Sequence, residues 1–322
     1  MMKIFVTRKI PNAGLDLLKK EYDVEVNPEN RVLRKEEIIE GVRGKDGLLC
    51  LLTDKIDKDI LLEESNLKMV ANYAVGFNNI DIKTATEKKI PVSNTPGILT
   101  DTTAELAWAL ILAVARRIAE DDRYTRAGKF SGWDPLLLLG MDLTKKTLAI
   151  IGAGRIGTAV GLKSRGFEMN VLYVDRTENN ILEEKLGAKK VSLDEAIKKA
   201  DVVSLHLPLI KDTRHMIGEK ELQMMKETAI LVNTSRGPVV DEQALIKALE
   251  KKWIFGAGLD VYENEPNVPL SLKKLDNVVL LPHVGSATFS TRSKMAVMAA
   301  ENMIAGLKGN KPPNCVNPEI YD

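Results

Sequence analysis

The chain contains little cysteine, few aromatic residues and almost no net charge. Its 322 residues include two cysteines, and Phe, Trp and Tyr together make up 5%. Cys50 lies in an apolar run and Cys315 lacks a partner pattern, so we expect no disulfide framework. The 46 Lys and Arg residues nearly balance 45 Asp and Glu residues. Because no overall field attracts nucleic acid or an anionic membrane, we expect small-molecule partners or self-association.

Long hydrophobic runs and metal-binding patterns are also missing. No apolar run approaches the roughly 18 residues that span a bilayer, and the apolar stretch near Met1 is too short for the core of a signal peptide. We therefore expect a cytoplasmic protein. No histidine pair or cysteine cluster has the spacing of metal ligands, so no metal site is predicted.

A regular alternation of short apolar runs and amphipathic stretches is present instead. It predicts parallel α/β sheets, with strands at residues 3–7, 47–52, 68–74, 147–151, 170–174, 201–205, 229–233 and 277–281. The strands form two series, separated by one long predicted helix at residues 101–128 that Asp101 would cap. A second helix is predicted at residues 287–307. If the chain then returns to the first domain, two crossovers near residues 100 and 287 would create a hinged cleft.

A glycine fingerprint follows the predicted strand at residues 147–151. There, Gly152 permits a tight turn, Gly154 lets the backbone approach a pyrophosphate, and Gly157 lets the following helix pack on the strand. Asp175 ends the next strand, 18 residues beyond Gly157. Its carboxylate suits the ribose hydroxyls of NAD(H) and repels a 2′-phosphate. Arg176 could bind that phosphate, so NADP(H) remains possible.

Among the three histidines, His283 is the predicted catalytic residue. It follows a strand that ends at Pro282 and begins a Gly/Ser/Thr-rich segment that could expose the ring. His206 is predicted to be partly buried with its polar groups satisfied, and His215 is predicted to lie on the surface.

A carboxylate and a guanidinium complete the predicted site. Glu265 is the candidate partner for the histidine, because a negative charge favours the imidazolium that protonates a ketone; Glu263 and Asp260 are alternatives. Arg236 follows a strand and could bind a carboxylate bidentately, although pairing with a nearby acid has equal weight. A cation, a carboxylate and an imidazole behind a dinucleotide turn predict reduction of a 2-keto acid.

Further motifs at residues 72–81, 94–96 and 102–105 extend this pattern over nearly the whole chain. With them, the chain resembles the D-isomer-specific 2-hydroxyacid dehydrogenases, and within that family the glyoxylate/hydroxypyruvate reductases. The resemblance implies two Rossmann-like α/β domains with a cleft between them. Residues 1–100 and 288–322 would form a flavodoxin-like substrate domain, and residues 101–287 a doubly wound NAD-binding domain.

The resemblance also implies roles for single residues. Arg236 would orient the substrate, Glu265 and His283 would form the acid/base pair, and Leu51 with the backbone at Val75 and Gly76 would contact the substrate. The implied cofactor contacts are Thr103, Gly152, Gly154, Arg155, Ile156, Gly157, Asp175, Arg176, Leu207, Pro208, Thr213, Thr234, Asp260 and Gly285. Family members are commonly homodimers.

Reduction of glyoxylate or hydroxypyruvate by NAD(P)H, with His283 as proton donor, is the leading hypothesis. A D-lactate, phosphoglycerate or other D-2-hydroxyacid dehydrogenase is the alternative, and a non-enzymatic NAD-sensing corepressor is a third hypothesis. Trp133 would either reach the active site of a neighbouring subunit or anchor the dimer interface.

Overall fold

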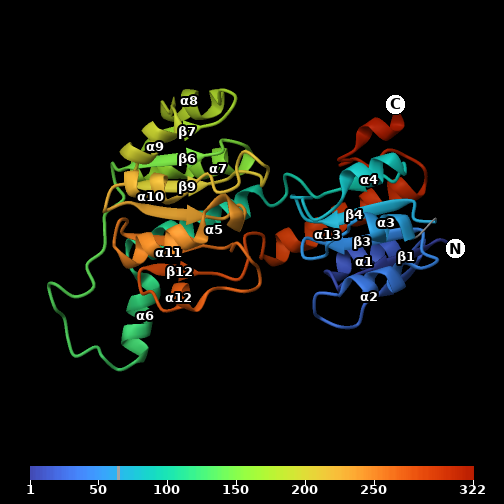
Figure 1. Cartoon of the computed structure of the whole chain (residues 1–322), viewed down its shortest axis with the longest axis horizontal. Helices are drawn as coiled ribbons and strands as arrows, with labels where there is room; N and C mark the ends of the chain where they lie inside the picture. Colours follow the sequence, from blue (N-terminus) through green and yellow to red (C-terminus); the bar gives the residue numbers. More distant parts are fainter. Residues whose placement is uncertain (64–65) are drawn as a thin grey trace. The chain divides into compact units, whose positions relative to one another are not determined.

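A computed structural model describes residues 1–63 and 66–322. The chain divides into two compact units, residues 1–99 with 286–322 and residues 100–285. Figure 1 colours the first unit blue and cyan with a red C-terminal part, and most of the second unit green to orange. Each unit contains one parallel β-sheet with helices on both faces, which confirms the predicted α/β class.

The first unit has a five-stranded sheet in the order β2-β1-β3-β4-β5. Its strands are β1 (Lys3–Val6), β2 (Asp23–Val26), β3 (Gly47–Leu51), β4 (Met69–Tyr73) and β5 (Val92–Ser93). Its helices are α1 (Asn12–Lys19), α2 (Lys35–Val42), α3 (Lys58–Glu63), α4 (Ile82–Glu87), α13 (Phe289–Leu307) and the short 3-10 helix η3 (Pro318–Tyr321).

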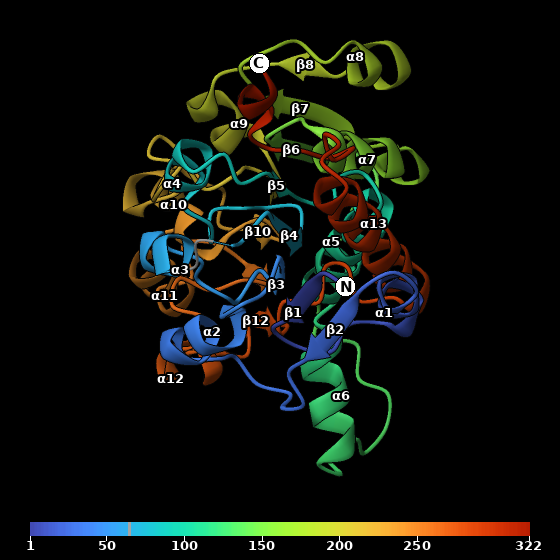
Figure 2. The same cartoon turned by 90° about the vertical axis from the view of Figure 1, so that its right-hand side faces the viewer.

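Alternating side chains of the strands supply both cores of this unit, because successive residues of a strand point to opposite faces. Ile4 and Val6 of β1 pack with residues of α1 and α13. Phe5 between them packs on the other face, with residues of α2 and α3. Figure 2 shows these two helical layers on either side of the sheet.

The second unit has a seven-stranded sheet in the order β12-β11-β10-β9-β6-β7-β8. Its strands are β6 (Thr147–Ile151), β7 (Asn170–Val174), β8 (Lys189–Lys190), β9 (Val202–Leu205), β10 (Ile230–Asn233), β11 (Gly256–Leu259) and β12 (Val278–Leu280). The strand order reverses next to β6, which pairs with both β7 and β9. In open α/β sheets, ligands bind outside the carboxyl ends of the strands at such a switch point.

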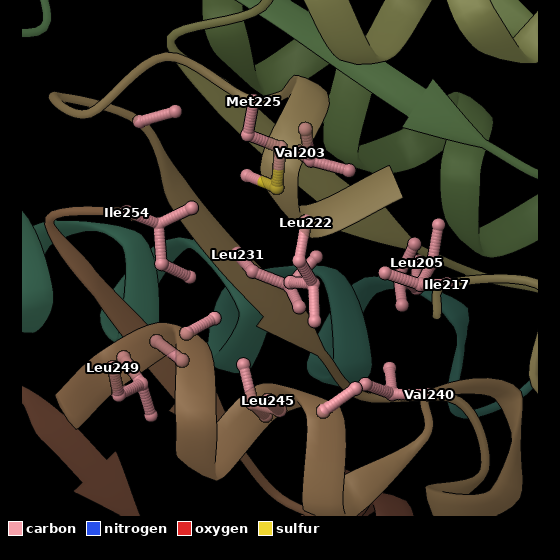
Figure 3. Packing of buried hydrophobic residues seen from close by; sticks show 14 of the residues in the cluster. Val203, Leu205, Ile217, Leu222, Met225, Leu231, Val240, Leu245, Leu249 and Ile254 are labelled. Atoms are coloured by element: carbon pink, nitrogen blue, oxygen red, sulfur yellow. The ribbon is translucent and has the colours of Figure 1, made fainter. Parts of the chain in front are cut away.

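Helices cover both faces of this sheet. They are α5 (Thr100–Ala115), α6 (Ile118–Arg126), α7 (Arg155–Lys163), α8 (Asn180–Leu186), α9 (Leu193–Lys199), α10 (Glu219–Met224), α11 (Glu242–Glu250), α12 (Leu270–Lys273), and the 3-10 helices η1 (Ser164–Phe167) and η2 (Gly237–Val239). Figure 3 shows one core, where Leu231 of β10 packs with Leu222 of α10 and Leu245 of α11. Among the described residues, no helix has the length and apolar content to cross a bilayer.

The predicted single helix at residues 101–128 is wrong, because the chain forms α5 and α6 with a break between them. Arg117 adopts a left-handed backbone conformation (φ 53°), which an α-helix cannot continue through. Its guanidinium binds Glu120 of the next turn at 2.9 Å. Asp101 is no N-cap either, since α5 already begins at Thr100.

Four strands were not predicted, and each has a weak sequence signal. β5 and β8 have two residues each, and β2 lies at the sheet edge with charged residues. β11 has the sequence Gly-Ala-Gly-Leu, which lacks the β-branched residues typical of strands. Its glycines are required by packing, since a Cβ on Gly258 would lie 2.9 Å from Leu110 of α5.

Candidate active site

The glycine fingerprint forms the turn between β6 and α7. Gly152 has φ 96°, a conformation that favours glycine, and a Cβ there would lie 2.8 Å from the carbonyl of His206. A Cβ on Gly157 would lie 2.1 Å from the carbonyl oxygen of Gly152. By contrast, a Cβ on Gly154 would meet no atom within 4 Å. The open space at the N-terminus of α7 therefore suits a pyrophosphate, whose charge the helix end favours.

Arg155 and Ile156, two of the implied cofactor contacts, form the first turn of α7. Asp175 lies beside the glycine turn, at the end of β7. Its carboxylate accepts hydrogen bonds from the backbone N–H of Ala153 at 2.7 Å and of Thr177 at 3.3 Å. Arg176 extends into solvent and binds Asp212 at 3.1 Å. The carboxylate is thus fixed beside the glycine turn.

Arg236 follows β10 in a loop that Asn233 shapes. The Asn233 side chain accepts hydrogen bonds from both the N–H and the hydroxyl of Ser235 and donates one to the carbonyl of Arg236. The Arg236 guanidinium donates to the Ser235 carbonyl at 2.7 Å. Burial lowers the pKa of Arg236 from its ordinary value, while the charge of Glu265 opposes this shift.

Glu265 and His283 form a hydrogen-bonded pair with 2.8 Å between Oε2 and Nδ1. The other Glu265 oxygen accepts the backbone N–H of Tyr262 at 3.1 Å. Burial by itself raises the pKa of Glu265, but the His283 hydrogen bond, that N–H and the charge of Arg236 together hold it below its ordinary value. The carboxylate is therefore ionised at neutral pH.

Asp260 fixes the backbone that carries His283. Its two buried carboxylate oxygens accept the N–H groups of Val284 at 2.7 Å and Gly285 at 2.8 Å. The histidine itself has φ 55°, an uncommon conformation for a residue other than glycine. Burial raises the pKa of Asp260 from its ordinary value. Asp260 thus holds the loop, whereas Glu265 holds the ring.

Tyr262 was missed by the sequence analysis, although it ties this loop to the sheet. Its hydroxyl donates to the carbonyl of Leu281 at 2.8 Å, next to the strand that precedes His283. Its carbonyl lies so close to Gly237 that a Cβ there would be 1.9 Å away. A tyrosine in an acidic loop gives no sequence signal for these contacts.

The remaining implied cofactor contacts also lie in the second unit. Thr103 is buried and donates to the Gly285 carbonyl at 3.1 Å. Leu207 and Pro208 follow β9, and the Thr213 hydroxyl donates to the Pro208 carbonyl at 2.6 Å. The Thr234 hydroxyl is buried and lacks a hydrogen-bond partner within residues 1–63 and 66–322.

The other two histidines differ from His283. His206 bonds the Ser204 hydroxyl at 2.8 Å through Nε2, but its buried Nδ1 has no partner in the described part of the chain. The ring is partly buried, as predicted, and its Nε2 has a polar partner. Burial lowers the pKa of His206 to about 3, so its ring is neutral. His215 is partly exposed, as predicted, and binds Glu263 at 2.7 Å.

The three predicted substrate contacts of the first unit lie at the end of β3 and just beyond β4. Leu51 is the last residue of β3, and its N–H donates to the Asp54 carboxylate at 2.8 Å. Asn79 donates to the Leu51 carbonyl at 3.1 Å. Val75 and Gly76 follow β4. Among the described residues, no cluster of His, Cys, Asp or Glu could hold a metal ion.

Comparison with known proteins identifies the family. A model of the NAD-binding domain of D-isomer-specific 2-hydroxyacid dehydrogenases matches residues 108–285. A glyoxylate reductase from Thermococcus litoralis is 51% identical over 322 residues, which cover 99% of this chain and 97% of that protein. The chain belongs to the D-isomer-specific 2-hydroxyacid dehydrogenases. The predicted family is thereby confirmed, and with it an enzyme that uses a nicotinamide cofactor.

Solved structures of this dehydrogenase family share the fold. A glyoxylate reductase from Paecilomyes thermophila has a TM-score of 0.88 and 31% identity, covering 99% of both chains. An NADPH-dependent glyoxylate/hydroxypyruvate reductase from Sinorhizobium meliloti, solved with NADP and malonate, has a TM-score of 0.86 and 30% identity. This match covers 98% of the present chain and 96% of that chain.

Proposed function

We propose that the protein reduces glyoxylate or hydroxypyruvate to the 2-hydroxy acid with a reduced nicotinamide cofactor. The observation that carries this proposal is the 2.8 Å hydrogen bond between His283 and an ionised Glu265. The charge of Arg236 also acts on this glutamate. The choice of glyoxylate as substrate is supported by the sequence identity of 51% with the glyoxylate reductase from Thermococcus litoralis.

The proposed reaction needs one hydride and one proton. When bound, the nicotinamide supplies the hydride to the keto carbon. His283 donates its proton to the carbonyl oxygen, which becomes the hydroxyl of the product. His283 donates a hydrogen bond to Glu265 through Nδ1, which leaves Nε2 to face the substrate. The negative charge of Glu265 stabilises the protonated ring. Arg236 holds the substrate carboxylate bidentately.

We assign the two units different tasks. Residues 100–285 bind the dinucleotide, with the pyrophosphate at Gly154 and the adenosine ribose at Asp175. Residues 1–99 with 286–322 supply the substrate contacts at Leu51, Val75 and Gly76. NAD(H) is the proposed cofactor, since a carboxylate at Asp175 repels a 2′-phosphate, although the related Sinorhizobium meliloti enzyme was solved with NADP.

We further propose a homodimer. Four large apolar side chains, Phe130, Trp133, Leu136 and Leu139, lie exposed on the segment that follows α6, and 86% of the Trp133 surface is exposed. Figure 1 shows this segment and α6 extending away from the sheet of the second unit. A patch of this kind marks a surface that a partner covers. The molar mass by light scattering tests this proposal, and a monomer with a solvent-exposed Trp133 would contradict it.

The function is tested by following oxidation of NADH and of NADPH with glyoxylate, hydroxypyruvate, pyruvate and phenylpyruvate. We expect fastest turnover of glyoxylate or hydroxypyruvate with NADH, and none in controls without a keto acid. Faster turnover of pyruvate or phenylpyruvate would make it another dehydrogenase of the family. No turnover of any keto acid would contradict the proposed enzyme and favour a sensor.

A further inference from the structure

Three consecutive carbonyl groups after β4 are each held by a specific donor. The Ala74 carbonyl accepts the backbone N–H of Thr95 at 2.8 Å. The Val75 carbonyl accepts the Asn94 side-chain amide at 2.7 Å, and the Gly76 carbonyl accepts that of Asn72 at 2.9 Å. The backbone of this short segment is thus fixed peptide by peptide.

These donors also fix the direction of three N–H groups. In a trans peptide the N–H points opposite to the carbonyl of the same peptide. The N–H groups of Val75, Gly76 and Phe77 therefore point away from Thr95, Asn94 and Asn72, respectively. In the described part of the chain these three groups donate no hydrogen bond. Successive N–H groups can form a concave site, or cradle, for an anion where the backbone turns, and the chain bends at residues 74–75, directly after β4.

The two asparagines are themselves firmly held. Asn72 lies in β4, is fully buried and also donates to the Asn79 side chain at 3.2 Å. The Asn94 carbonyl accepts the Asn302 side-chain amide at 3.2 Å, and its N–H donates to the Asn314 carbonyl at 3.2 Å. Asn302 comes from α13, so the C-terminal part of the chain supports this position.

We propose that Asn72 and Asn94 are positioning residues that aim the N–H groups of residues 75–77 at the substrate carboxylate. This inference rests on the proposed function, because it requires an anionic keto acid as the substrate. The asparagines bind the backbone without touching the substrate. Their amides are neutral at all accessible pH values, so the cradle recognises the anion through backbone dipoles and adds no titrating group.

The variants Asn94→Ala and Asn72→Ala test this role, with Asn317→Ala as the matched control. Asn317 is also buried in the first unit and holds backbone, donating to the Ile90 carbonyl at 2.9 Å and accepting the Val92 N–H at 2.8 Å. In the described part of the chain, its side chain makes no hydrogen bond with residues 74–77. If replacing a buried asparagine lowers stability in general, the thermal midpoint falls in all three variants, including the control.

We expect Asn94→Ala to raise the KM for glyoxylate about five- to tenfold, as for loss of one hydrogen bond, with kcat and the KM for NADH changed less than about twofold. The Kd of oxamate, an unreactive anion shaped like a 2-keto acid, should rise by the same factor in calorimetry with NADH present. Asn72→Ala should act alike, and Asn317→Ala should change neither constant.

If wild type, Asn94→Ala and Asn72→Ala bind oxamate equally well and have the same KM for glyoxylate, the two asparagines do not position the N–H groups and the proposal is wrong. The same holds if Asn317→Ala weakens oxamate as much as the other two variants do. Failure of the wild-type protein to reduce glyoxylate would instead overturn the proposed substrate, and oxamate binding then still decides whether the asparagines position an anion cradle.

Discussion

The carboxyl ends of the strands differ in chemistry between the two units. In the second unit they carry charged or titratable groups, among them Arg236, Asp260 and His283, with Glu265 close by. In the first unit, the loops after β3 and β4 are shaped by three neutral asparagines, Asn72, Asn79 and Asn94, and by the buried carboxylate of Asp54, which also binds backbone. The side chains at the edge of the second unit can transfer protons and bind charged groups. Those at the edge of the first unit hold the backbone of the loops in place.

This difference explains why a single parallel α/β plan can serve two tasks. Charged side chains require partners that set their protonation, and the second unit supplies these through Glu265 and Tyr262. Amide side chains do not titrate, so their function depends only on the direction of their hydrogen bonds. We expect changes to the His283–Glu265 pair to reduce turnover, and changes at the asparagines of the first unit to weaken substrate binding, so these two groups can be separated by kinetics.

The largest expected effect comes from His283→Ala. Loss of a positioned general acid costs about 10²- to 10⁴-fold in rate, so kcat for glyoxylate should fall by about 10³. His215→Ala is the control, because it removes a histidine that pairs with Glu263 away from the Glu265 ring contact. Steady-state NADH oxidation measures both variants. Near-normal turnover of His283→Ala would show that another group donates the proton.

Arg236→Lys should have the next largest effect. Lysine keeps the positive charge but cannot bind a carboxylate bidentately, so the KM for glyoxylate should rise about 10- to 100-fold with a smaller change in kcat. The Kd of oxamate should follow the KM. If the KM stays at the wild-type value while kcat falls, Arg236 acts in the chemical step instead of in binding.

Glu265→Gln should change the pH profile. The pKa of Glu265 lies below its ordinary value, so the group is negatively charged at neutral pH and stabilises a proton on the adjoining ring. Without this charge the proton is lost at lower pH, and the alkaline limb of kcat/KM for reduction should move down by about one pH unit. An unchanged limb, or one moved to higher pH, would contradict this coupling.

Two glycines of the cofactor turn should respond differently to alanine. A Cβ on Gly154 meets open space, whereas one on Gly157 would lie 2.1 Å from a backbone oxygen. Gly154→Ala should keep the thermal midpoint but raise the KM for NADH about fivefold, by filling space that the pyrophosphate needs. Gly157→Ala should lower the thermal midpoint. Equal behaviour of both variants would contradict the assigned cofactor position.

The smallest expected effect is on cofactor choice. Asp175→Asn keeps an oxygen that can accept the Ala153 N–H but removes the negative charge. The ratio of kcat/KM for NADPH to that for NADH should therefore rise a few-fold, because a 2′-phosphate is no longer repelled. An unaltered ratio would show that Arg176 or another group determines the preference.

The sequence predicted the parts of the molecule that depend on local patterns. β6 and β7 have the predicted bounds because their apolar, partly β-branched residues form continuous runs. The glycine turn could be predicted because its three glycines have distinct steric reasons at fixed spacing. The Arg236, Glu265 and His283 segments stood out through charge and loop chemistry, and the structure brings Glu265 and His283 into contact.

Other features depend on contacts between distant residues and left no local pattern. The break at Arg117 arises in a stretch without Pro or Gly, so no residue type marks it. Asn94 meets Val75 only because β5 lies beside β4 in the sheet. The support of Tyr262 by Leu281 likewise needs β11 and β12 as neighbours. Propensity and periodicity do not encode such pairs.

One comparison tests the division of labour between the two edges most directly, namely kcat and KM for glyoxylate in His283→Ala and Asn94→Ala under identical conditions. We predict that His283→Ala loses kcat by about 10³ with little change in KM. Asn94→Ala should raise KM about five- to tenfold and keep kcat. The same pattern in both variants, or the reverse assignment, would contradict the account.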